Sequence, residues 1–331
     1  MVEAISDVTV RISVLSPQSV VGLGIPAVFV AGTTPGIEEF KSLEGLSEKY
    51  TAGTSVHSKA KAVFNQINKP SKIIVITYAT GEIAAAAEAH FLAEWHFALL
   101  AENVPADALA LSNFIEGQGY KFLVVQLPEA AGLAQFSANS LTIGVVHAIE
   151  GEHLDAALVG DAASATVGSL TWKFRKDLVG ISPSKVTQGE LEAIHAAGGI
   201  AYVTKAGIAQ TSEGKTVGGE FIDALHGDQW IKATIETRLQ TLMTNTDKIS
   251  FDANGIALLD SELTTVFEQA YTNGIVNMND ETEKGDYTIT ALQRVDLDPA
   301  DIAARNYKGL SFRYKRAGAI HAVDVSGTVE V

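Results

Sequence analysis

The sequence predicts an α/β protein in which mixed sheets are flanked by helices. Its 331 residues are 47% hydrophobic and 19% charged, a composition that suits a globular chain of about two domains with genuine cores. Short runs rich in β-branched residues alternate with segments of helical periodicity, which is typical of a sheet with mostly parallel strands. A half-apolar strand pattern near each terminus further predicts two terminal strand arms.

The first half of the chain carries most of the expected strands. Residues 7–15 alternate polar with apolar side chains, so they predict a strand with one dry face. Residues 72–78 (KIIVITY) are a nearly continuous β-branched run, which predicts a strand covered on both faces. Further strands are expected at 27–31, 120–127, 141–147 and 156–160.

Helices are expected between these strands. Residues 38–50 predict mixed helix and turn, and 58–68 predict a helix that buries Val63 and Ile67. A long helix is predicted over 81–100, because five apolar residues there follow one another at i, i+4 spacing. These residues are Ile83, Ala87, Phe91, Trp95 and Leu99.

The second half begins with a short helix at 188–197 and continues with two longer amphipathic helices, at 228–244 and 255–271. We expect Trp230, Ile231, Ile235 and Leu239 to bury one face of the first of these in the core. Asp298 followed by Pro299 predicts another helix start, since an aspartate can cap and a proline has no amide to leave unpaired. Strands are expected at 200–204, 287–292, 309–315 and 319–331.

These elements divide the chain into four predicted segments. A strand arm covers 1–20, an α/β domain 21–200, a C-terminal α/β domain 201–318 and a second strand arm 319–331. A half-dry strand at a terminus must pair with something. It can complete the sheet of its own chain, or it can add itself to the sheet edge of a neighbouring copy.

Composition and charge exclude several functional classes. The formal net charge is −15, which opposes docking onto nucleic acid or anionic lipid. The chain has no cysteine, so a thiolate zinc site, an Fe–S cluster and a cysteine nucleophile are all excluded. No apolar run approaches the roughly 18 residues that a membrane-spanning helix requires.

The motifs that could bind a ligand are incomplete. The Gly-Lys-Thr at 214–216 lacks the earlier glycine of a phosphate-binding loop, since Ala209 stands there. The Gly-Leu-Gly at 22–24 precedes an apolar strand instead of following one. The acidic run at 279–286 (NDETEKGD) fits a solvated hairpin tip, and the eight histidines form no metal-binding spacing. We therefore expect no catalytic, cofactor-binding or metal-binding residues.

The last third of the chain resembles a known family. Between Leu191 and Val331 it carries, in order, a series of short motifs that together resemble the tail sheath proteins of contractile bacteriophages and related contractile injection particles. The motifs are Gly198-Gly199 before the strand at 200–204, Phe221-Ile222-Asp223, Asp228-Gln229-Trp230-Ile231, Lys248 to Asp252, Asn254-Gly255-Ile256, Tyr287 to Thr290, Asp301 to Arg305, Gly309 to Phe312 and Gly318 to His321.

The resemblance implies a structural protein and not an enzyme. Sheath subunits stack helically as six-membered rings around a tube, and terminal arms donate strands to neighbouring subunits. The expected partners are copies of this chain, the tail tube protein, and baseplate and tail terminator proteins, with no nucleic acid and no membrane insertion. The expected place is the virion tail, after assembly in the bacterial host cytoplasm. The arm residues would be Val8, Val10, Ile12, Val14, Ile320, Val323, Val325, Val329 and Val331.

Two other functions fit the same sequence. One is a static shell or tube protein of a phage particle, which would use the same terminal strands without contracting. The other is a small-molecule enzyme of the doubly wound class, for which residues 72–159 supply strands but no site.

Overall fold

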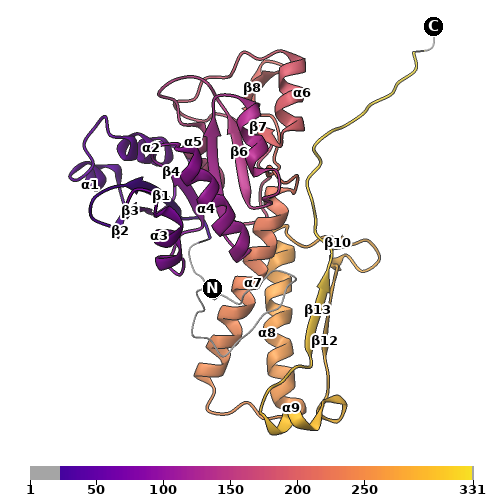
Figure 1. The fold of residues 1–331 in the computed structure, drawn as a ribbon. Helices are drawn as coiled ribbons and strands as arrows, with labels where there is room; N and C mark the ends of the chain where they lie inside the picture. Colours follow the sequence, from indigo (N-terminus) through magenta and orange to yellow (C-terminus); the bar gives the residue numbers. More distant parts are fainter. Residues whose placement is uncertain (1–22, 330–331) are drawn as a thin grey trace.

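The computed structural model describes residues 23–329 of the chain (Figure 1). A seven-stranded sheet dominates the first half, with strand order β2-β3-β1-β4-β5-β6-β7. Its strand pairs are parallel except for β2 with β3, so the predicted α/β class with mixed sheets is confirmed. The strands are β1 (Pro26–Ala31), β2 (Gly36–Phe40), β3 (Ile73–Tyr78), β4 (Phe97–Leu100), β5 (Phe122–Leu127), β6 (Thr142–Val146) and β7 (Gly199–Ile200).

Helices cover this sheet and close its core. Strands β3, β5 and β6 are buried at nearly every position, which requires cover on both faces. Helix α2 packs against α5, and α3 packs against α4. Their bounds are α1 (Leu43–Ser47), α2 (Ser55–Phe64), α3 (Ile83–Ala89), α4 (Pro105–Gln118), α5 (Leu154–Ala162) and α6 (Gln188–Ala196), with a 3₁₀ turn at Ala130–Phe136.

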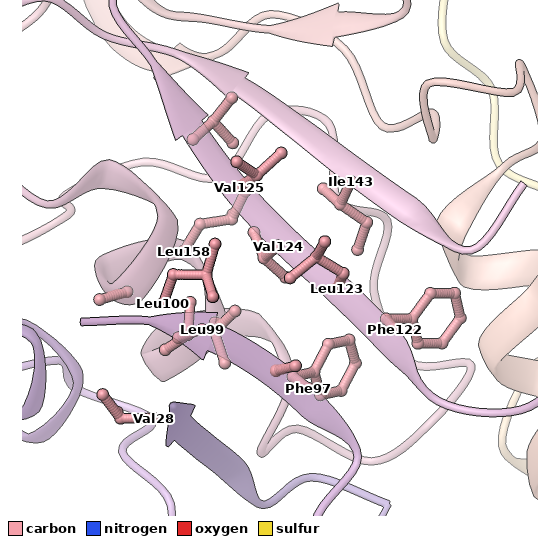
Figure 2. Close-up of a cluster of buried hydrophobic side chains, with 14 of the residues drawn as sticks. Val28, Phe97, Leu99, Leu100, Phe122, Leu123, Val124, Val125, Ile143 and Leu158 are labelled. Atoms are coloured by element: carbon pink, nitrogen blue, oxygen red, sulfur yellow. The ribbon is translucent and has the colours of Figure 1, made fainter. Parts of the chain in front are cut away.

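Neighbouring central strands bring the largest apolar side chains together (Figure 2). Phe97 of β4 stacks on Phe122 of β5 with ring centroids 5.3 Å apart. Trp95, just before β4, is fully buried and meets Phe29 of β1 edge to face. Full burial of such side chains is worth roughly 1.5 to 3 kcal/mol each, so this layer supplies the main stabilisation of the chain.

The second half is built on two long helices, α7 (Ile222–Asn245) and α8 (Ala253–Thr272), which lie side by side (Figure 1). Ile231, Ile235 and Leu239 are buried in a second core, as predicted for this helix face, and Trp230 packs at its margin. The remaining elements are β8 (Tyr202–Lys205), β9 (Ile208–Thr211), β10 (Met278–Asn279), β11 (Lys284–Gly285), β12 (Tyr287–Ala291), α9 (Pro299–Ala303) and β13 (Leu310–Tyr314), with a 3₁₀ turn at Arg294–Asp296.

The long helix predicted over 81–100 is wrong. The chain instead forms α3, which ends at Ala89, and then the strand β4, which lies between β1 and β5. All five residues of the predicted stripe are nevertheless fully buried. The spacing marks the buried face of a helix over Ile83 and Ala87, but at Leu99 it marks only burial, because a strand covered on both faces buries every position.

Other predicted elements also differ from the structure. Residues 156–160 belong to helix α5, which is buried all round and therefore shows no helical period. The segment at 38–50 contains β2 as well as α1. Ile67 lies beyond the end of α2 and is 80% exposed instead of buried. None of the helices within 23–329 is long and apolar enough to cross a membrane.

Candidate functional site

The hairpin of β12 and β13 is a small sheet with one dry face. Its strands are antiparallel, with Tyr287 opposite Tyr314 and Ala291 opposite Leu310. Along each strand half-buried and exposed residues alternate, as the period of a strand requires. The half-buried side chains pack on α8, where the Phe267 ring lies 5.0 Å from the Phe312 ring, centroid to centroid.

Both outer edges of this hairpin are open within the described part of the chain. Among residues 23–329, β12 pairs with β13 and with no other strand, and the reverse holds for β13. An open edge presents backbone N–H and C=O groups that can pair with a further strand. A two-stranded sheet is marginal alone in water, so added strands would strengthen it.

The C-terminal arm, residues 317–329, runs away from the body of the protein in an extended path (Figure 1). The strand predicted at 319–331 does not form over 319–329, because no other segment among the described residues lies alongside to supply a ladder. The arm carries four large apolar side chains in solvent. Ile320 is 80% exposed, Val323 75%, and Val325 and Val329 both 89%.

The root of the arm is fixed to the start of α7 and to the loop after α8. The Asp228 carboxylate on α7 accepts hydrogen bonds from Nε and Nη2 of Arg316. It also accepts a hydrogen bond from the Tyr314 hydroxyl. The Ala317 amide donates to the Ile275 carbonyl at 2.9 Å. These contacts hold the base of the arm while the segment beyond it stays free of secondary structure.

A cavity of about 160 Å³ lies beside this root. Its walls include Thr171, Asp223, Ile275 and Ala319, and burial raises the pKa of the Asp223 carboxyl. The Arg316 side chain also lines the cavity, and the volume has room for a few water molecules. Within residues 23–329 no group of three or more histidine, aspartate or glutamate side chains is placed to hold a metal ion.

The structure brings some of the predicted arm residues onto one segment. Ile320, Val323, Val325 and Val329 lie together on the exposed C-terminal arm. The other predicted arm residues, Val8, Val10, Ile12, Val14 and Val331, lie outside the described residues. Sequence reasoning predicted both strands of the hairpin but did not show that they form a two-stranded sheet with one face packed on α8. The available signal was the regular alternation of Thr288, Thr290, Ser311 and Arg313 with apolar residues.

Comparison with known proteins supports a single family. Residues 222–329 match the family described as E217 tail sheath protein gp31-like, C-terminal domain. The chain is similar over 100% of both chains to a protein of the sixfold-symmetrised anti-feeding prophage baseplate, with a TM-score of 0.71 and 13% identity.

Two contracted sheath structures are also similar. In the extracellular contractile injection system PVC, a sheath chain matches with a TM-score of 0.68 and 11% identity, covering 100% of this chain and 99% of that one. In the anti-feeding prophage helical sheath the TM-score is 0.64 and the identity 12%, with 99% of each chain covered. No curated protein sequence matches the chain.

The resemblance predicted from the short motifs is thus confirmed. The matched segment begins where α7 begins and includes the hairpin and all of the described arm. The chain has the fold of contractile sheath proteins, and its residues 222–329 match the tail sheath gp31-like C-terminal domain.

Proposed function

We propose that the chain is a structural subunit that polymerises into a contractile sheath around a tail tube, drives the tube forward on contraction, and catalyses no reaction. One observation carries the proposal. The same chain presents an apolar arm with no partner among residues 23–329 and a half-dry hairpin whose two edges are open.

Arm and hairpin complement each other chemically. The arm has the alternation of Val323 and Val325 that a strand with one dry face needs, and the hairpin already buries the matching face against α8. Adding a strand supplies backbone hydrogen bonds to the open edge and removes exposed valines from water. A second copy of the chain is therefore the proposed occupant of the hairpin edge.

Such a contact joins different surfaces of two subunits, so it does not close on itself as a twofold dimer does. Heterologous contacts of this type generate rings or helical polymers. Residues 7–15 carry the same one-sided pattern, and we propose that they donate a second strand. Two donated strands would link each subunit to two neighbours, as in rings of six subunits stacked helically around a tube.

Contraction follows if the extended lattice has the higher free energy. Release at the baseplate end would then spread along the polymer, because the contacts that one subunit gains favour the same change in the next. Flexible donated strands would let the subunit bodies rotate while the polymer stays connected. A tube protein, a baseplate and a tail terminator are the further proposed partners of a particle assembled in the bacterial cytoplasm.

Imaging of the purified chain by negative stain tests this function. We expect hollow tubes with a lumen wide enough for an inner tube, in two lattice states that differ in length and diameter. Discrete small oligomers that bind a nucleotide would contradict the proposal and favour an enzyme. Tubes with one invariant lattice would contradict contraction and favour a static assembly protein.

A further inference from the structure

His321 differs from every other residue of the arm beyond Ala317. Its side chain is only 13% exposed, whereas residues 318–320 and 322–329 are all exposed. The ring lies against the body of the protein, although the residues on both sides of it face solvent. Something in the body therefore holds this one position.

Three separate segments hold the ring. The Nε2 atom lies 2.8 Å from the Thr171 hydroxyl, and Nδ1 lies 3.2 Å from a Glu213 carboxylate oxygen. The ring of Phe221, at the start of α7, meets the imidazole edge to face with centroids 5.1 Å apart. Phe174 meets it in the same way at 6.1 Å.

The backbone at Gly214 passes close to the ring. A Cβ added at Gly214 would lie 2.8 Å from the Lys173 amide nitrogen and 3.4 Å from Cε1 of His321. The close approach of the Lys173 backbone requires a glycine here, and the His321 ring lies beside it at an ordinary contact distance. Gly214 of the Gly-Lys-Thr at 214–216 thus lies next to the arm root.

The partners of His321 suit both of its protonation states. Burial acts to raise the pKa of Glu213, but the Gly214 amide and the charges of Lys173 and His321 outweigh it and lower that pKa. The ionised Glu213 accepts a hydrogen bond from Nδ1–H when the ring is protonated and also when it is neutral with the proton on Nδ1. The Thr171 hydroxyl can donate to a neutral Nε2 or accept from a protonated one.

We propose that His321 is a positioning residue, which fixes where the C-terminal arm leaves the subunit so that only the chain from Ala322 onward is free to reach a neighbour. The use of the arm by a neighbour rests on the proposed function, but the contacts of His321 lie within a single subunit.

The arm position can be measured directly, because the chain contains no native cysteine. Spin labels on Ala193→Cys, at an exposed position of α6, and on Ser326→Cys of the arm report the distance between body and arm. In His321→Ala we expect the distance distribution to widen about 1.3-fold, since the free chain before the label grows from roughly five to roughly nine residues and chain spread scales with the square root of length.

Matched variants distinguish the loss of the His321 contacts from a nonspecific effect of substitution on the subunit. Val323→Ala, two residues along the arm, should leave the distribution unchanged. His321→Gln should restore a narrow one through a hydrogen bond to Glu213 or Thr171, and Glu213→Gln should widen it less than His321→Ala. An unchanged width in His321→Ala with a normal melting temperature would overturn the proposal.

Assembly gives the second readout. We expect His321→Ala to form fewer or irregular tubes, while His321→Gln, which keeps a hydrogen-bonding side chain at this position, forms more regular ones than His321→Ala does. Tubes of His321→Ala with the same yield and helical parameters as the parent chain would overturn the positioning role. If the parent chain itself forms no tubes, the proposed function fails, and the distance measurement still decides whether His321 fixes the arm.

Discussion

The two sheets of this protein differ in what they require from outside the chain. Strand β5 of the large sheet is buried at five of its six positions, whereas β12 of the hairpin alternates half-buried with exposed residues. Elements of the same chain cover both faces of the large sheet, whereas the hairpin keeps one face exposed. Within residues 23–329 both sheets have open edges, at β2 and β7 and at β12 and β13. The buried core is therefore concentrated in the large sheet, and the proposed strand addition is assigned to the hairpin.

Helix α7 joins the two regions. Ile222 in its first turn belongs to the core of the large sheet, and Ile231 and Ile235 belong to the core beneath the hairpin. The arm root binds the same helix through Asp228. In the proposed sheath, neighbours that pull on the arm would thus load a helix anchored in both cores.

The largest expected effect tests whether the hairpin is part of the subunit core at all. Phe267 of α8 is fully buried and contacts the rings of Tyr287, Phe312 and Tyr314. Phe267→Ala should lower the free energy of unfolding by about 3 to 5 kcal/mol in urea titrations. Tyr287→Phe, which removes only the hydroxyl that donates to Glu268, should cost about 1 kcal/mol. A loss below that of Tyr287→Phe would mean that the hairpin is not docked.

The stacked pair of His96 and His226 predicts that the stability of the protein depends on pH. The rings of His96 and His226 are stacked 5.2 Å apart beneath α7, and both side chains are buried. Burial lowers the pKa of His226 to about 4, and that of His96 also lies well below its ordinary value. The unfolded chain takes up these protons near its ordinary pKa of about 6.5 while the folded chain resists, so stability falls as the pH drops from there toward about 4.

This dependence is measured by urea unfolding at about pH 7 and about pH 5, where His226 alone should account for a loss of about 2 kcal/mol. His226→Gln should show a smaller difference between the two pH values than the parent chain. Part of this change comes from His96, because the charge of His226 is one of the causes that lower the pKa of His96, so the comparison reports on the stacked pair. His57→Gln, a change on helix α2, should keep the parent difference. Equal differences in parent and His226→Gln would contradict a buried neutral histidine.

A smaller effect is expected at the start of α8, which supports the hairpin. The Asp252 side chain accepts a hydrogen bond from the Gly255 amide at 2.9 Å and so caps the helix. Asp252→Ala should cost about 1 kcal/mol in thermal unfolding. Asp247→Ala, at an exposed position in the preceding turn, should cost much less. Equal costs for the two variants would show that the cap contributes nothing specific.

Elements with a solvent-exposed face or a capping residue could be predicted from the sequence, whereas elements buried on all sides could not. The helix start at Asp298-Pro299 was predicted from capping chemistry, and the Asp298 side chain does accept from the Ala300 amide. Strand β4 and helix α5 were misassigned, because an element buried on all sides shows no period of its own.

The arm shows a second limit of sequence reasoning. The alternating valines predicted a strand, but a strand needs a partner, and the chain supplies none within its described residues. His321 shares the alternation of Val323 and Val325, so nothing in the pattern separates it from them. Its contacts with Thr171 and Glu213 join segments 150 and 108 residues apart, and such contacts depend on the tertiary fold.

Deleting Ser326–Val331 tests most directly whether the arm serves neighbours and not its own subunit. Residues 326–329 are exposed, Val329 by 89%, so the deletion removes no core contact of the described chain. The melting temperature of the monomer should therefore stay within about 1 °C of the parent value, whereas loss of several kcal/mol of core packing would lower it by several degrees, at roughly 1.5 °C per kcal/mol for a chain of this size. Tube formation, followed by negative stain, should be abolished. A destabilised monomer that still forms tubes would contradict the account.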